Sequence, residues 1–321
     1  MKAVAPPATG VRLHWEDLPA PVRRAVENLL GAPVDTAVTQ PGGFSPGLAA
    51  RLQLTDGRRA FVKAVSAETN PHSPSLHRAE GHNTAALPTD VPVPRLLGSY
   101  DDGTWVVLAF EDIAGHQPHI PWQPEELTRV LDAVGELAAR LTPSPVDVPY
   151  AADILESTFS GWRKLAAAGD PGDTDGLDPW ARRHLDALVR IAEGWSDGVR
   201  GDTLAHGDLR ADNMLLTPDR VVFVDWPHAC RAAPWFDLLV MLPCVAAQGG
   251  PDPEELFLRH PLGRDADPEA VTAVLAALAG YFVRNSLQPP PPGLPTLRAF
   301  QGAQGAEALA WLRKRLGPAL P

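Results

Sequence analysis

Acidic and amide side chains stand at both ends of a short apolar hairpin in the last third of the chain. Asp208 and Asn213 precede the apolar residues 214–216, and Asp225 follows the apolar residues 221–224. The Thr-Pro-Asp-Arg segment between the two runs is typical of a turn, so a hairpin would make Asn213 and Asp225 neighbours. Carboxylate and amide oxygens are ligands that suit Mg²⁺. Asp208 could accept a proton from a hydroxyl beside that metal.

The motif H-G-D-L-R-A-D-N, which begins at His206 and is followed by Asp225, resembles the catalytic and metal-binding loops of the aminoglycoside phosphotransferases and their relatives. Those proteins share the protein-kinase-like fold. The protein-kinase pattern is H-R-D-x-x-x-x-N followed by D-F-G. This chain has Gly207 in place of the Arg and Asp-Trp-Pro in place of D-F-G. Both departures indicate the branch that phosphorylates small molecules.

The resemblance implies a role for each polar residue of the motif. Asp208 would position and deprotonate the acceptor hydroxyl. Asn213 and Asp225 would hold Mg²⁺, His206 would orient the loop, and Arg210 would face the γ-phosphate. Any one of these acids alone could be a turn or helix-capping residue, but this interpretation loses weight because four polar residue types stand at fixed offsets around two strands.

A glycine-rich turn and a lysine lie far upstream of the motif. Residues 41–47 read Pro-Gly-Gly-Phe-Ser-Pro-Gly, between strands expected over 34–40 and 48–54. Glycines allow backbone N–H groups to approach phosphate oxygens closely. Lys63 lies in the middle of the next expected strand, over 60–65, where a lysine directed at the core needs a partner or a ligand.

The same resemblance assigns these upstream residues to the nucleotide. Gly42, Gly43 and Ser45 would cover the phosphates. Lys63 would bind the α- and β-phosphates, oriented by Glu80 on a helix expected over residues 76–87. Taken alone, Lys63 could face solvent and Glu80 could be a solvated helix residue. Their occurrence with the catalytic motif in one chain favours the nucleotide site.

The resemblance and the order of elements together predict an α+β, two-lobed protein-kinase-like fold. Residues 1–111 would form a small N-terminal lobe, an antiparallel sheet with one helix, that binds nucleotide. Residues 112–321 would form a larger, mostly helical lobe that carries the catalytic and substrate-binding residues. Backbone groups near Phe110, Glu111 and Asp112, at the hinge, would bind adenine.

Outside these regions, apolar spacing predicts further helices. One is expected ahead of the first strand, and the rest belong to the second lobe. They cover residues 21–30, 124–141, 152–168, 179–194, 253–260, 268–283 and 295–316.

Composition excludes several classes of protein. The chain has 321 residues and a net charge of −11, which argues against an electrostatic nucleic-acid binder. No run of 18 apolar residues could span a membrane, and the N-terminus lacks the apolar region of a signal peptide. Two cysteines give no disulfide framework, so we expect a cytoplasmic protein.

The sequence thus predicts an ATP- and Mg²⁺-dependent kinase that acts on a hydroxyl of a small molecule, with GTP not excluded. The family implies an aminoglycoside-like antibiotic or another hydroxylated metabolite as acceptor. Its identity, the oligomeric state and the choice among resistance, biosynthesis and metabolism stay open. Asp252, Glu254, Glu255 and Glu307 could bind a polycation, or could form a solvated surface. A nucleotide-binding pseudokinase and a protein kinase are the alternative functions.

Overall fold

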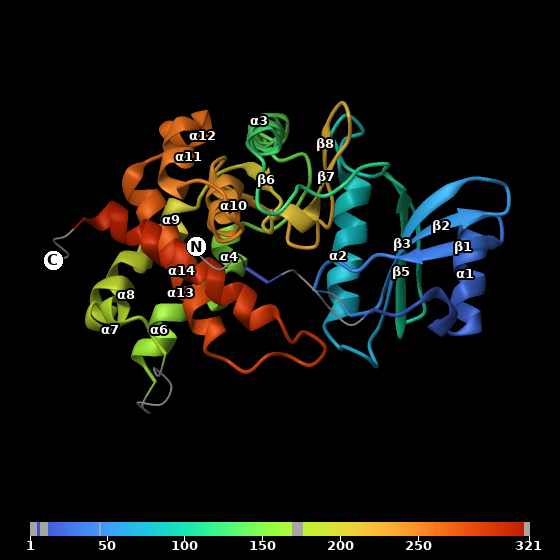
Figure 1. The fold of residues 1–321 in the computed structure, drawn as a ribbon, viewed down its shortest axis with the longest axis horizontal. Coiled ribbons are helices and arrows are strands. Elements are labelled where there is room, and N and C mark those ends of the chain that lie inside the picture. The colour runs from blue at the N-terminus through green and yellow to red at the C-terminus, as the bar shows by residue number, and fades with distance from the viewer. Residues whose placement is uncertain (1–4, 7–11, 45, 169–175, 318–321) are drawn as a thin grey trace.

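A five-stranded antiparallel sheet forms the core of the smaller of two lobes (Figure 1). The computed structural model describes residues 5–6, 12–44, 46–168 and 176–317. The strands lie in the order β1-β2-β3-β5-β4, and all neighbours are antiparallel. The strands expected over 34–40, 48–54 and 60–65 are present, with both ends within one residue of the expected position. The strands are β1 Val34–Thr39, β2 Leu48–Leu54, β3 Arg59–Ser66, β4 Leu96–Asp101 and β5 Trp105–Glu111.

The first helix, α1 (Ala20–Leu30), covers the face of the sheet that points away from the large lobe (Figure 1). Val22, Val26 and Leu30 recur at helical spacing and are buried against the apolar face of the strands. Gly31, with φ of 77°, ends the helix. The described part of the small lobe therefore holds two α-helices, α1 and α2 (Ser73–Ala86), although we expected a sheet with one helix. The spacing of apolar residues predicted this helix but gave no sign that it packs on the sheet.

The next helix, α2 (Ser73–Ala86), lies on the opposite face, between the sheet and the large lobe (Figure 1). It begins before the expected start because the Asn70 side chain accepts hydrogen bonds from two backbone N–H groups of its first turn. Gly81 allows close approach to β5, since a Cβ at this position would lie 2.8 Å from a methyl group of Leu108. This close packing brings Glu80 to the sheet.

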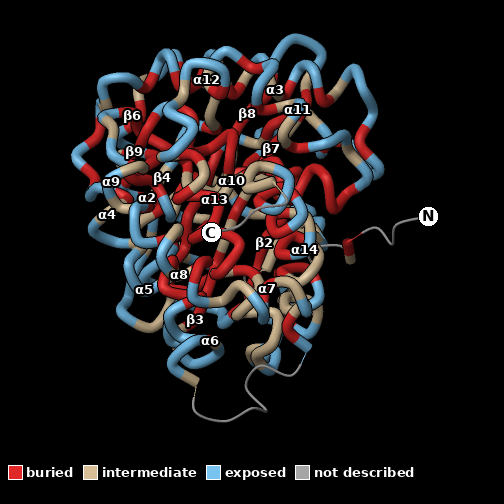
Figure 2. Tube along the Cα trace, turned by 90° about the vertical axis from the view of Figure 1, so that its left-hand side faces the viewer, coloured by how far each residue is buried: buried red, intermediate tan, exposed pale blue. Residues whose placement is uncertain are grey.

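Helices build the larger lobe. They are α3 Pro124–Arg140, α4 Ala151–Ile154, α5 Glu156–Phe159, α6 Gly161–Ala166, α7 Pro179–Arg183, α8 Leu185–Glu193, α9 Trp195–Gly198, α10 Phe236–Ala247, α11 Pro253–Arg259, α12 Pro261–Arg264, α13 Pro268–Ser286 and α14 Leu297–Leu316. Buried segments gather at α10 and α13, with exposed turns around them (Figure 2). In the described part of the chain, no helix has both the length and the apolar character needed to cross a membrane.

Two of the expected helices are divided. The segment 152–168 forms the three short helices α4, α5 and α6, and 179–194 is interrupted at His184 between α7 and α8. The turns in the first segment place Gly161 against α13, where a Cβ would lie 2.1 Å from the carbonyl oxygen of Gly280. Because this contact joins residues far apart in the chain, local apolar spacing could not indicate the breaks.

Two small two-stranded sheets lie where the lobes meet (Figure 1). The first is the predicted hairpin, in which β7 (Met214–Leu216) pairs with β8 (Val221–Phe223). The residue after β8 donates its N–H to the carbonyl oxygen of Asn213 at 3.0 Å, which extends the hairpin toward its polar end. In the second sheet, β6 (Thr203–Ala205) pairs with β9 (Cys230–Ala232). Together they carry the catalytic motif.

The start of the chain contacts the large lobe. The N–H of Ala5 donates to the carbonyl oxygen of Ala247 at 2.9 Å, and its side chain packs near Cys244 and Phe300. Ala5, which belongs to the range 1–111 expected for the small lobe, therefore contacts the large lobe. The division into lobes at residue 111 stays a prediction.

Candidate active site

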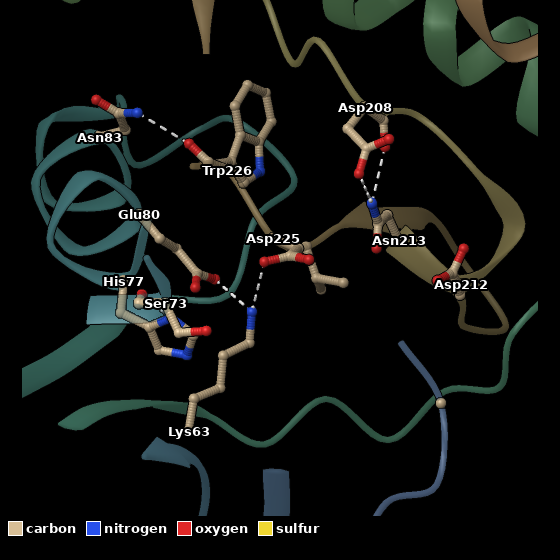
Figure 3. A network of polar contacts seen from close by, with 12 residues as sticks. Lys63, Ser73, His77, Glu80, Asn83, Asp208, Asp212, Asn213, Asp225 and Trp226 are labelled. Carbon is tan, nitrogen blue, oxygen red and sulfur yellow. Dashed lines mark hydrogen bonds and ion pairs between the residues drawn. The ribbon is translucent and has the colours of Figure 1, made fainter. Parts of the chain in front are cut away.

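Lys63 connects three elements that are far apart in the sequence (Figure 3). Its Nζ donates to Glu80 Oε1 on α2 at 2.7 Å and to Asp225 Oδ1, just after β8, at 2.8 Å. Alternation along β3 explains this direction, because Val62 and Ala64 are buried against α1 and Lys63 points to the other face. The structure thus brings together three residues singled out in the sequence.

Burial and charge act against each other in this cluster. Burial would raise the pKa of Asp225, but the adjacent Lys63 ammonium holds it below its ordinary value. Burial would also lower the pKa of Lys63, and the two carboxylates outweigh it and raise that pKa. Burial raises the pKa of Glu80 to about 7 against the effect of Lys63. The ammonium is therefore charged, with Asp225 as its ionised partner.

Two side-chain oxygens at this site, one of Asn213 and one of Asp225, suit a hard cation. Asn213 donates its Nδ2 to the main-chain oxygen of Asp208 at 2.7 Å and to Oδ2 of the same residue at 3.3 Å (Figure 3). Its Oδ1 has no hydrogen-bond partner among the described residues, nor has Asp225 Oδ2. One amide oxygen and one carboxylate oxygen form a donor set that fits Mg²⁺. These are the two residues expected to hold the metal.

Arg210 forms ion pairs with two carboxylates of the catalytic loop. Its Nη1 donates to both carboxylate oxygens of Asp208, at 2.8 and 2.9 Å, and its Nε and Nη2 donate to Asp212 at 3.0 and 3.1 Å. The guanidinium also lies beside the rings of Phe44 and Phe300, 5.6 and 5.8 Å from their centroids. Two neighbouring carboxylates therefore hold it beside the base, and the role toward the γ-phosphate that the resemblance implies stays a prediction.

His206 and Asp237 hold the backbone of the catalytic loop. Asp237, on α10, accepts the N–H groups of His206 and Gly207 at 2.7 and 2.9 Å. The His206 Nε2 lies 2.9 Å from the carbonyl oxygen of Val224, and its Nδ1 accepts the N–H of Asp208 at 3.2 Å. Burial lowers the pKa of His206 to about 4, so the ring is neutral and carries its proton on Nε2. This geometry matches the orienting role expected for His206.

The environment of Asp208 favours a base of moderate strength. Burial raises its pKa above the ordinary carboxyl value, and the charge of Arg210 opposes that rise. Its Oδ1 accepts one hydrogen bond from Arg210, and its Oδ2 accepts hydrogen bonds from Arg210 and Asn213. A carboxylate offers about four lone-pair sites, so Oδ1 can still accept a substrate hydroxyl.

Gly207 is required by the geometry of the loop. Its φ is 80°, and a Cβ would lie 2.5 Å from the carbonyl oxygen of His228. We expect Gly207→Ala to lower the free energy of unfolding by about 3 kcal/mol or more, because left-handed backbone alone costs an alanine about 1–2 kcal/mol. Urea unfolding would measure this loss. Gly57→Ala is the matched control, since Gly57 has φ of 86° with nothing within 4 Å of its Cβ position. Equal losses in the two variants would contradict a specific contact at residue 207.

A cavity of about 160 Å³ lies between the lobes beside this cluster. Its lining includes the sequence-predicted residues Gly42, Gly43, Lys63, Glu80, Phe110, Glu111, Asp112, Asn213 and Asp225. Ser45 lies outside the described residues. Apolar side chains on both sides, Phe61 and Leu215 among them, would suit a flat ring.

Fewer backbone groups of the hinge are available to bind adenine than we expected. The Glu111 N–H donates to the carbonyl oxygen of Arg95 at 2.9 Å, so it is already used within the sheet. The Asp112 carboxylate is nearly buried and forms ion pairs with Arg51, at 3.3 Å, and with Arg59. The backbone beyond the end of β5 is therefore the better placed to meet a base, and Ile113 also lines the cavity there.

Sequence reasoning missed two arginines in the lining of this cavity, Arg51 and Arg12. Arg12 precedes α1 and donates from Nη2 to the carbonyl oxygen of Gly42. Burial lowers the pKa of its guanidinium, and the charges of Asp225 and Asp212 oppose this effect. No motif surrounds Arg12 in the sequence, so only the fold could place it beside the glycine-rich turn.

Comparisons with known proteins agree with this geometry. A model of the phosphotransferase enzyme family matches residues 42–290. A choline/ethanolamine kinase family protein from Mesorhizobium loti superposes with a TM-score of 0.57 at 17% identity, over 92% of this chain and 95% of that one. An aminoglycoside-3'-phosphotransferase of type VIII gives a TM-score of 0.50 at 26% identity, over 80% and 97%. Choline kinase from Cryptosporidium parvum Iowa II gives 0.54 at 12%, over 88% and 89%. No curated protein sequence matches the chain.

Proposed function

The chain belongs to the phosphotransferase enzyme family, and we propose that it transfers the γ-phosphate of ATP to a hydroxyl group of a small molecule with the help of Mg²⁺. One observation carries most of the proposal. Lys63 Nζ lies 2.7 Å from Glu80 and 2.8 Å from Asp225. The sheet contributes Lys63, α2 contributes Glu80, and the end of the catalytic hairpin contributes Asp225. This is the arrangement that phosphoryl transfer needs, because catalysis consists mainly of positioning and charge neutralisation.

Each residue then has a role that follows from its position. Lys63 binds phosphate oxygens as a fixed positive charge, and Glu80 keeps it directed into the cleft. Asn213 and Asp225 would hold Mg²⁺, which neutralises charge on the phosphates when it is bound. Gly42 and Gly43 line the same cavity, so the glycine-rich turn lies where it could cover the phosphates.

Asp208 acts on the acceptor. Its free lone pair on Oδ1 accepts a hydrogen bond from the hydroxyl and orients the oxygen toward the γ-phosphorus. The new P–O bond forms as the bond to the β-phosphate oxygen breaks, and the hydroxyl proton passes to Asp208. Arg210, which binds both oxygens of that carboxylate, stabilises the ionised form of the base before the transfer.

We also propose that the small lobe is the nucleotide-binding part and that the lobe from residue 112 onward carries the catalytic residues and most of the acceptor-binding residues. The nucleotide cavity takes its glycines, Lys63 and Glu80 from the small lobe. A cytoplasmic location suits an ATP-dependent enzyme whose cysteines, Cys230 and Cys244, are both free and buried.

The melting temperature in the presence of nucleotides tests the proposal. Mg-ATP should raise it by several degrees, because a ligand that binds only the folded state stabilises that state by mass action. The rise should be much smaller when EDTA removes the metal. Parallel scans with Mg-GTP would determine the nucleotide preference.

Two outcomes would count against the proposal. If neither nucleotide changes the melting temperature, the cleft is not a nucleotide site. A metal-dependent rise without ADP release for any hydroxylated acceptor would instead favour the nucleotide-binding pseudokinase.

A further inference from the structure

A second cavity, of about 360 Å³, opens on the large-lobe side of Asp208. Asp208 and Asp225 line it, so it adjoins the nucleotide cavity at the reacting atoms. Under the proposed function, on which this inference rests, it is the place where the acceptor hydroxyl must lie. A cavity of this size holds a ligand comparable to a drug molecule. The chemistry of its walls therefore describes the acceptor.

Most of the wall is apolar. Rings from both lobes contribute to it, among them Phe44 from the glycine-rich turn, Phe159 from α5 and Phe300 from α14. Two of the large apolar side chains that are exposed on the described chain also belong to this cavity. They are Leu76, 37% exposed, and Ile154, 44% exposed. Aromatic rings inside and exposed aliphatic groups favour a ligand with a sizeable apolar body.

Two of the uncharged polar side chains in the wall, Gln304 and Tyr281, can still bind a ligand. Gln304 on α14 is only 4% exposed, yet its amide has no hydrogen-bond partner within the described part of the chain. Tyr281 on α13 accepts a hydrogen bond from Gln301 at 3.3 Å, which leaves its own O–H free to donate. A ligand hydroxyl or carbonyl in the cavity could pair with this amide.

Every carboxylate that lines this cavity already has a cationic partner. Asp208 is paired with Arg210, and Glu80 and Asp225 share Lys63. An ammonium group placed here would lose its hydration without gaining an unpaired carboxylate. His228, also in the lining, adds no negative charge.

The acids that could have bound a polycation are used elsewhere. Asp252 begins α11 and pairs with Lys314 at 3.0 Å. Glu254 pairs with Arg315 at 2.8 Å, and Glu255 pairs within its own helix. These acids, like Glu307, do not line the cavity beside Asp208. Their positions support the solvated-surface interpretation.

We propose that the acceptor is an uncharged alcohol with a large apolar body, bound by aromatic contacts and by hydrogen bonds to Gln304 and Tyr281. Polyamino sugars should be poor acceptors, because each carboxylate that lines this cavity already forms an ion pair with Lys63 or Arg210.

Calorimetric titration of the full chain without nucleotide tests this directly. The probes are two uncharged alcohols, chloramphenicol and erythronolide B, and the polycation kanamycin, each at 50 and 300 mM NaCl. We expect saturable binding of at least one uncharged alcohol with little dependence on salt, and none for kanamycin. Saturable kanamycin binding that weakens with salt would overturn the proposal, and so would the failure of both alcohols to bind.

Variants connect the binding to the cavity. Gln304→Leu should lower the affinity for the alcohol that binds by about threefold to tenfold, which corresponds to the usual contribution of one hydrogen bond. The matched control is Glu255→Gln, an exposed acid outside the cavity, which should leave the affinity unchanged. Equal affinity in the Gln304→Leu variant and the parent chain would contradict the assignment. Because no nucleotide is present, failure of these titrations is separate from failure of the Mg-ATP melting test.

Discussion

Replacing Asp225 by asparagine should reduce the rate of phosphoryl transfer by about 10³-fold or more while the protein still folds. Asparagine has nearly the same shape and tolerates the left-handed backbone of this position, where φ is 72°. What it lacks is the negative charge that faces Lys63 and the expected metal. Charge stabilisation by a metal is worth several kcal/mol, and about 4 kcal/mol corresponds to 10³-fold in rate.

The buried lysine keeps Glu80 as a partner in this variant, at 2.7 Å, so folding should not be lost. The measurement is ADP release under saturating substrates, together with the rise in melting temperature caused by Mg-ATP. Both should fall, because the metal-binding carboxylate is gone. Asp219→Asn is the control, since Asp219 is an exposed turn residue of the same hairpin. A rate within tenfold of the parent would remove Asp225 from the metal site.

Replacing Asp208 by asparagine should have a different signature. The maximal rate should fall by about 10² to 10⁴, which is the usual contribution of a general base. Mg-ATP should still stabilise the variant, because Asp208 does not line the nucleotide cavity. Arg210 would retain its pair with Asp212, at 3.0 Å, so the loop should keep its conformation. A loss of nucleotide binding together with the rate would indicate damage to the loop instead of loss of a base.

The pH dependence of the parent enzyme supplies an independent check on Asp208. Transfer requires the ionised carboxylate, and burial raises the pKa of Asp208 above its ordinary value. The value of kcat/KM should therefore fall as the pH decreases through that raised pKa, so the acid limb should lie above the range of an ordinary Asp. This limb should be missing from the residual activity of the Asp208→Asn variant.

Local patterns in the sequence were enough to predict β1, β2, β3 and the catalytic hairpin, but not β6 and β9. The apolar run over residues 60–65 predicted β3 with Lys63 in its middle, and the catalytic motif together with the family resemblance assigned Glu80 and Asp225 to it. These predictions succeeded because strands and tight turns depend on residues that are neighbours in the chain.

The features that sequence reasoning missed depend on contacts between distant residues. The contact of Gly161 with Gly280 divides an expected helix, and no apolar spacing reveals it. Arg12 reaches the nucleotide cavity only because the fold places its segment beside the glycine-rich turn. Arg210 lies beside two rings contributed by different lobes, and no local pattern indicates these contacts.

The position of Phe44 couples the two substrates thermodynamically. This ring lines both the nucleotide cavity and the cavity beside Asp208, and its centroid lies 5.2 Å from that of Phe300 on α14. A ligand that moves the ring in one cavity must change the shape of the other. We therefore expect heterotropic linkage between the two substrates: whatever factor the acceptor imposes on the affinity for nucleotide, the nucleotide should impose on the affinity for the acceptor.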